Sequence, residues 1–160
     1  MPKSTQAIPK GYHTVTPSLM VAGAARAIDF YKKALGAQEL SRFPGPDGNI
    51  MHAEIKIGDS MIFLSDEFPE MSPDTKSPQA AGCVTASLFL YVPDVDALFQ
   101  RAVDAGATVK MPVTDMFWGD RYGKVVDPFG HHWLLATHKE DLTQEEMQKR
   151  QAEWEKKQKK

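Results

Sequence analysis

His52 and Glu54 are a pair of side chains with the chemistry to bind a ligand. They lie two positions apart in the segment from Met51 to Ile57, in which apolar and polar residues alternate. Because side chains two apart on a β-strand point to the same side, both should face one polar space. There they would either contact a ligand or hydrogen-bond only to each other as part of a cavity wall. Joined by His132, the pair also forms an alternative set of metal ligands.

A second cluster of candidate residues runs from Phe117 to Tyr122 and combines three aromatic rings with an acid and a base. Trp118 and its aromatic neighbours are suited to stack on a flat ligand, while Asp120 and Arg121 are suited to bind its polar groups. In the alternative interpretation, Asp120 pairs with Arg121 and the rings cover the mouth of a cavity.

Ser87, Phe89 and Tyr91 form a third candidate set. They share one face of a predicted strand by the two-residue period of a β-strand. The internal repeat described below indicates that this face points inward, so we expect the three side chains to line a pocket.

Composition excludes several classes of function. The chain has 160 residues, the length of one domain, and a net charge of −2, which gives no strong field to attract nucleic acid or an anionic membrane. Its single cysteine, Cys83, excludes an intramolecular disulfide and a Cys-rich zinc module. We find no apolar run of signal-peptide or transmembrane length and no phosphate-binding glycine loop. We therefore expect a cytoplasmic protein without a nucleotide or other cofactor.

An internal repeat organises the chain. Gly36-Ala37 follows a helix-like run from Ala24 to Leu35, and Gly106-Ala107 follows another from Val95 to Ala105, 70 residues later. Both runs have apolar residues at steps of three and four, typical of amphipathic helices. A short strand precedes each helix and three strand-like segments follow it, so the pattern is βαβββ twice.

The repeat predicts an α+β fold of two tandem βαβββ modules that form a curved mixed sheet with a central cavity, plus a C-terminal helix. Each helix should cover the apolar face of its strands and leave the polar face for the cavity. The predicted boundaries are an N-terminal arm over 1–14, one domain over 15–138 and a charged helix over 139–160. Within the domain we expect module one at 15–66, a proline-rich connector at 67–83 and module two at 84–138.

The C-terminal segment differs in kind from the two modules. Thr143 and Glu146 have the spacing of a capping box, and four Glu-before-base pairs follow at i, i+4. We expect a solvated helix that leans on the body or on a second subunit. Alternatively, its lysine-rich end binds a partner.

Two strings carry a resemblance to a known family. The segment from Ala27 to Ala37 (AIDFYKKALGA) and the turn from Asp127 to His131 (DPFGH) resemble the vicinal oxygen chelate superfamily. That superfamily contains glyoxalases, extradiol dioxygenases, fosfomycin-resistance enzymes and bleomycin-binding proteins. The resemblance covers Val15 to His138. Three further segments look most like its PhnB-like branch: Val15 to Leu19, Phe117 to Arg121 and Ala136 to His138.

The resemblance also bears on metal binding. Metal enzymes of the superfamily take ligands from the first and last strands of each module, and alignment places these positions at Thr16, Phe63, Ser87 and Leu134. None is a strong ligand for a divalent ion, which needs at least three good donors around one point.

The resemblance therefore implies a metal-independent homodimer that binds a small molecule, aromatic or partly polar, in the cavity between paired modules. The alternative is a metal-dependent lyase, isomerase or dioxygenase with a non-standard site at His52, Glu54 and His132. Whether the chain is an enzyme stays open.

Overall fold

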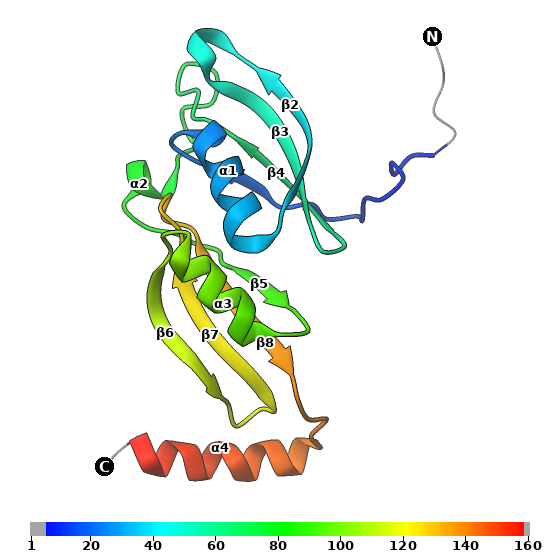
Figure 1. Cartoon of the computed structure of the whole chain (residues 1–160), viewed down its shortest axis with the longest axis vertical. Coiled ribbons are helices and arrows are strands. Elements are labelled where there is room, and N and C mark those ends of the chain that lie inside the picture. The colour runs from blue at the N-terminus through cyan, green and yellow to red at the C-terminus, as the bar shows by residue number, and fades with distance from the viewer. Residues whose placement is uncertain (1–5, 159–160) are drawn as a thin grey trace. The chain divides into compact units, whose positions relative to one another are not determined.

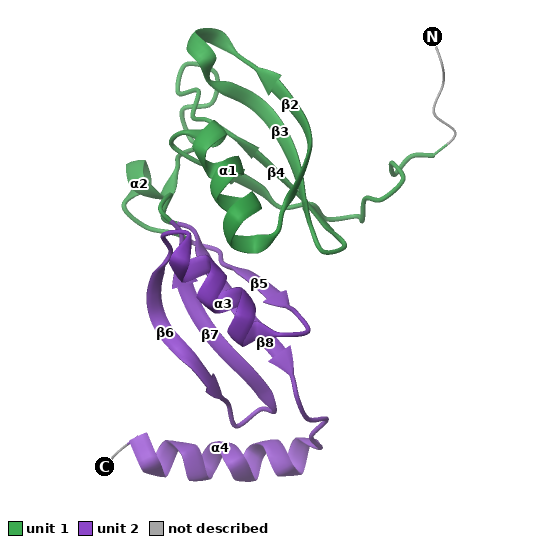
Figure 2. Cartoon of the chain, in the orientation of Figure 1, with its two compact units in different colours: residues 1–84, 128–130 green, residues 85–127, 131–160 purple. Residues whose placement is uncertain are grey.

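A computed structural model describes residues 6–158 of the chain. These residues form two compact units, shown in different colours in Figure 2. Unit 1 comprises residues up to Val84 together with Pro128–Gly130, and unit 2 comprises Thr85–Asp127 and residues from His131 onward. The turn at Pro128–Gly130 thus packs with unit 1, although the strands on either side of it belong to unit 2.

Unit 1 is a four-stranded mixed sheet with a helix on one face (Figure 1). Its elements are β1 (Ser18–Met20), α1 (Ala24–Leu35), β2 (Gln38–Pro44), a 3-10 turn η1 (Pro46–Gly48), β3 (Ile50–Ile57), β4 (Ser60–Ser65) and the short α2 (Pro78–Ala81). The strand order is β1-β4-β3-β2. β1 pairs with β4 in parallel, and the other pairs are antiparallel.

The helix α1 forms because its apolar residues lie on one stripe that buries against the sheet. Ile28 and Tyr31 are fully buried, as are Ala53 and Ile55 of β3. The helix ends at Gly36, whose φ of 68° is the left-handed conformation that glycine adopts without steric cost. The stripe thus fixes which face of β3 is covered, and His52 and Glu54 lie on the other face.

Unit 2 repeats this arrangement. Its elements are β5 (Leu88–Tyr91), α3 (Val95–Asp104), β6 (Thr108–Asp115), β7 (Asp120–Val126), β8 (His132–His138) and α4 (Gln144–Gln158). The strand order is β5-β8-β7-β6, with β5 parallel to β8 and the other pairs antiparallel. The order is that of unit 1, element for element.

Helix α3 begins at Asp94, whose carboxylate accepts a 3.0 Å hydrogen bond from the backbone N–H of Ala97. It packs on the face of the sheet that holds Trp133 and Leu135, which are 1% and 0% exposed. Gly123 lies under this helix, because a Cβ there would come within 2.8 Å of the Phe99 ring.

The structure confirms the α+β class and the doubled βαβββ unit. Each module forms one four-stranded mixed sheet, as the repeat predicts, and neither sheet closes on itself. Part of the predicted connector is ordered as α2, where Ser77 caps the first turn by accepting from Ala80 N–H. None of the described helices is long and apolar enough to span a membrane.

The predicted C-terminal helix is present as α4, and the capping box forms. Thr143 Oγ1 accepts from the N–H of Glu146, whose carboxylate accepts from the N–H of Thr143. The helix is exposed along its length, and its Trp154 contacts Phe117 in the turn between β6 and β7, with ring centroids 5.6 Å apart. The last two lysines of the tail lie outside the described residues.

Candidate functional site

The open face of the unit 1 sheet brings His52 and Glu54 together. Because α1 covers Ala53 and Ile55, the alternation of β3 turns the intervening polar side chains to the other side. His52 Nε2 lies 3.3 Å from Glu54 Oε1. The ring of Phe63, on the neighbouring strand β4, meets the His52 ring edge-on at 4.8 Å between centroids. Their spacing of two residues therefore correctly predicted that His52 and Glu54 lie on the same face of the strand.

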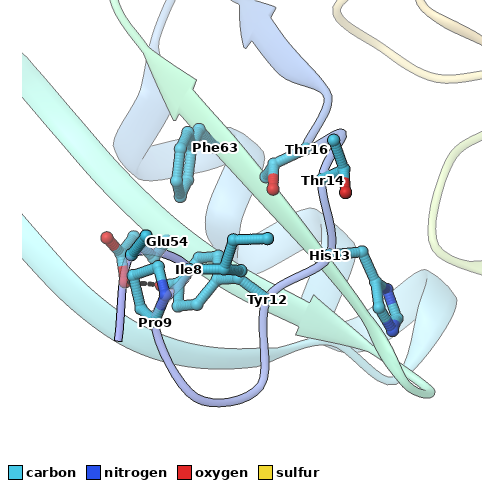
Figure 3. A pocket seen from close by; sticks show the side chains of 9 residues that line it. Ile8, Pro9, Tyr12, His13, Thr14, Thr16, Glu54 and Phe63 are labelled. Atoms are coloured by element: carbon cyan, nitrogen blue, oxygen red, sulfur yellow. Dashed lines mark hydrogen bonds between the residues drawn. The ribbon is translucent and has the colours of Figure 1, made fainter. Parts of the chain in front are cut away.

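The N-terminal arm contributes a residue that the sequence did not single out. The Tyr12 hydroxyl donates a 2.5 Å hydrogen bond to Glu54 Oε2, drawn as a dashed line in Figure 3. Its ring lies 5.9 Å from that of Phe63, tilted by 49°. Part of the predicted N-terminal arm therefore lines the site. The only sequence signal was an aromatic residue in an arm without a periodic pattern.

Arm and sheet together line an open pocket of about 520 Å³ (Figure 3). That volume is in the range of small-molecule sites. In Figure 3 Ile8, Pro9, Tyr12 and Glu54 gather at one end, and His13 lies at the other. The described lining residues are Ala7, Ile8, Pro9, Tyr12, His13, Thr14, Thr16, Glu54 and Phe63. All of them belong to unit 1.

The pocket carries a negative charge at Glu54. The hydrogen bond from Tyr12, followed by that from His52, holds the pKa of the Glu54 carboxyl below its usual value. The same bond raises the pKa of Tyr12 to about 12, because removing the phenolic proton would set two negative charges side by side. At neutral pH the pair is therefore a phenol donating to a carboxylate.

The open face of unit 2 is built around the carboxylate of Asp120, which is 3% exposed. Its Oδ2 accepts 3.0 Å hydrogen bonds from the Tyr91 hydroxyl and from Trp118 Nε1. Its Oδ1 lies 2.7 Å from His138 Nδ1. With three neighbours, this carboxylate is engaged in holding the surrounding side chains rather than free to receive a ligand.

Aromatic rings cover Asp120 and form an exposed platform. Phe89 stacks on Tyr122 at 5.8 Å and lies 4.9 Å from Tyr91, while Trp118 meets Tyr122 edge-on at 5.6 Å. Phe89 and Tyr91 are 44% and 64% exposed. The sequence placed Phe89 and Tyr91 on one face correctly, and Trp118 lies with them.

Arg121 does not join this platform. It lies next to Asp120 in β7, so its side chain points to the opposite face, toward α3. There it binds Asp96 with two hydrogen bonds of 2.6 and 2.7 Å and Asp115 with one of 3.1 Å. The sequence suggested that Arg121 either binds a ligand together with Asp120 or pairs with Asp120. The structure shows neither arrangement, because Arg121 binds Asp96 and Asp115 instead.

Two other predicted residues lie at strand ends in unit 2. Ser87 is exposed just before β5. His132 begins β8, and burial, with lesser contributions from Lys124 and Lys110, lowers the pKa of its imidazole. It belongs to unit 2, whereas His52 and Glu54 belong to unit 1.

The donor set for a metal ion is poor. Across residues 6–158 no group of three or more His, Cys, Asp or Glu side chains is arranged to hold one. In unit 1 the two positions that the family resemblance assigns to ligands, Thr16 and Phe63, both line the pocket. A threonine hydroxyl and a phenyl ring do not fit a divalent ion, which needs nitrogen, thiolate or carboxylate donors.

Comparison with known proteins identifies the family. Residues 12–135 match the model of the Glyoxalase/Bleomycin resistance protein/Dioxygenase superfamily. The chain belongs to this superfamily. The Rv0887c protein of Mycobacterium tuberculosis is 47% identical to it over 135 residues, which cover 84% of this chain and 79% of that protein.

Two solved structures share the fold. TioX from Micromonospora sp. ML1 is 28% identical, with a TM-score of 0.62 over 79% of this chain and 98% of that one. The PhnB protein from Bacillus cereus is 18% identical, with a TM-score of 0.61 over 78% of this chain and 99% of that one. The likeness to the PhnB protein shows a shared fold.

Proposed function

We propose that this superfamily member is a small-molecule-binding protein that holds its ligand in the unit 1 pocket without a metal ion. The observation that carries the proposal is the pocket itself. It has the volume of a ligand site and a charged carboxylate in its wall, and Thr16 and Phe63 take the positions of metal ligands.

The rings around Glu54 support an aromatic or partly aromatic ligand. Tyr12 and Phe63 present apolar area beside a hydrogen-bonding group, the combination that fixes both the affinity and the orientation of a small molecule. On unit 2, Phe89, Tyr91 and Trp118 offer a second apolar surface of the same chemistry. We include this platform in the proposal as a surface for flat molecules.

A ligand screen on chelator-treated protein tests the proposal. A panel of aromatic amines, alcohols, carboxylic acids and planar dyes is scored by the change in melting temperature of the full chain, since a ligand that binds the native state raises it. We expect saturable hits that Phe63→Ala weakens. Phe117→Ala, which removes an aromatic ring from unit 2, is the matched control and leaves hits in the unit 1 pocket unchanged. A panel without a single hit overturns the proposal.

The metal-dependent alternative makes a different prediction. A lyase, isomerase or dioxygenase built on His52, Glu54 and His132 would bind about one metal ion per chain, because its chemistry needs a Lewis acid. Elemental analysis of protein purified without chelator decides between the metal-independent binding protein and the metal-dependent enzyme. Zinc, nickel, manganese or iron near one equivalent would contradict our proposal.

We further propose that the chain is a homodimer whose subunits meet through open sheet faces. Phe43 is 58% exposed beside His52 in unit 1, and Phe89 and Tyr91 are similarly exposed in unit 2. Large apolar side chains that are exposed on a sheet face are typical of protein–protein interfaces. Light scattering after size exclusion tests this. We expect a dimer that Phe43→Lys dissociates, and a monomer at all concentrations would contradict the proposal.

A further inference from the structure

We propose that the unit 1 pocket selects organic cations: molecules with a protonated nitrogen attached to an aromatic or aliphatic body. This inference rests on the proposed function, since it names the class of ligand for the same pocket. It is drawn from the carboxylate, the rings and the charges that line the pocket.

Glu54 supplies the acceptor. Its side chain is 25% exposed and is part of the pocket wall. A carboxylate has about four acceptor positions on its two oxygens. Tyr12 takes one on Oε2, His52 lies beside one on Oε1, and the hydroxyl of Ser41, the cross-strand partner of Glu54, also acts on the carboxylate. About one position is then left for a donor that enters the pocket. A protonated amine is the donor that gains most there, because a hydrogen bond between two charged groups is about twice as strong as a neutral one.

The rings beside Glu54 favour the same ligand. The face of an aromatic ring attracts a cation within about 6 Å of its centre. Tyr12 and Phe63 are tilted toward each other by 49°, and the edge-on contact of His52 holds the Phe63 ring in place. Ile8 and Pro9 add aliphatic surface at the same end of the pocket (Figure 3). A cation with an apolar body would therefore meet a carboxylate, ring faces and an apolar wall together.

The charges around the pocket disfavour the opposite class. No lysine or arginine is among the lining residues that the structure describes, and neither Lys10 of the arm nor Lys56 of β3 is one of them. His13 is at the far end from Glu54 (Figure 3). An anionic ligand would face the carboxylate of Glu54 with no lysine or arginine among the described lining residues to compensate it, and a neutral ligand would lose the charge-assisted bond. Selectivity then comes from repulsion as well as attraction.

Three probes with one naphthalene body and different charges test the inference. At pH 7, 2-naphthylmethylamine is a cation, 2-naphthylmethanol is neutral and 2-naphthoate is an anion. Their affinities for the chelator-treated full chain are measured by isothermal titration calorimetry. We expect the cation to bind about tenfold more tightly than the alcohol, the difference that one hydrogen bond between charged groups makes. The carboxylate should bind most weakly.

Substitutions assign the preference to Glu54. Glu54→Gln keeps the shape and an acceptor for Tyr12 but removes the charge, and should reduce the preference for the cation to about twofold or less. Asp29→Asn is the matched control, because it removes one negative charge from α1, on the covered side of the same sheet. It should leave the preference unchanged. The three probes are compared on the unmodified chain. The inference can therefore still be tested if the Glu54→Gln variant does not fold.

The outcomes separate this inference from the function on which it rests. If the alcohol or the carboxylate binds as tightly as the amine, the inference is overturned while the binding function stands. If none of the three probes binds but members of the wider panel do, the inference also fails and the function again stands. If nothing in the panel binds, both fail.

Discussion

Asp66 is the residue whose loss should damage unit 1 most directly. It follows β4, is 7% exposed, and its two oxygens accept three backbone hydrogen bonds. Oδ1 accepts from Gly23 and Ala24 at the start of α1, at 2.8 and 2.9 Å, and Oδ2 accepts from Ile50 at the start of β3, at 2.8 Å. One carboxylate therefore joins the helix to the sheet that carries the pocket.

The size of the loss follows from these bonds. In Asp66→Ala the three N–H groups lose their acceptor, and each buried one costs about 1–3 kcal/mol. The bonds to Ala24 and Ile50 are buried and the bond to Gly23 is partly buried. The carboxylate also stabilises the positive end of the α1 dipole. Together these terms predict a loss of about 4 kcal/mol in the free energy of unfolding.

Urea denaturation followed by far-UV circular dichroism measures this loss. Asp66→Asn should fall between Ala and the unmodified chain, because its carbonyl still accepts from the helix while its NH₂ faces the N–H of Ile50. Asp29→Asn on the exposed side of α1 is the control and should change the value by less than about 0.5 kcal/mol. A loss below about 1 kcal/mol for Asp66→Ala would refute the reasoning, because it would mean that the amides find other partners.

Two further predictions concern the segment of unit 2 that leads from β8 to α4. Hydrogen bonds to Asp141 and Asp120 raise the pKa of His138, so the stability it adds is complete below about pH 6.5 and is lost as pH rises through its folded pKa. The melting temperature should therefore exceed that of His138→Gln at pH 6 and approach it at pH 9, and a gap independent of pH would contradict this. Gly119→Ala should lower the free energy of unfolding by more than about 1 kcal/mol, because φ is 95° and the new Cβ would lie 2.5 Å from the Glu140 carbonyl oxygen; an unchanged urea midpoint would contradict that.

Much of the fold was predictable from local patterns. The alternation from Met51 to Ile57 gave β3 and its open face, and the spacing of apolar residues gave α1 with its end at Gly36. Each of these features depends on neighbours within a few residues. The parallel pairing of β1 with β4 and of β5 with β8 joins strands that are far apart in the sequence, so no local pattern predicts it.

The site was less predictable, for two physical reasons. Asp120 and Arg121 were expected to act together, but adjacent residues in a strand face opposite sides, so the period that placed His52 and Glu54 correctly also separates this pair. Tyr12 reaches Glu54 across 42 positions of sequence, through an arm without periodic pattern. Its contact depends on how the arm folds back over the sheet.

The central claim, that the unit 1 pocket holds a small molecule without a metal ion, is most directly tested by a nuclear magnetic resonance titration. The ¹⁵N-labelled full chain, treated with excess EDTA, is titrated with the three naphthyl probes and with the hits of the ligand screen. We predict that saturable changes in amide chemical shift centre on Tyr12, Glu54 and Phe63. Changes that appear only after zinc or nickel is added, or that leave these residues unaffected, would contradict the claim.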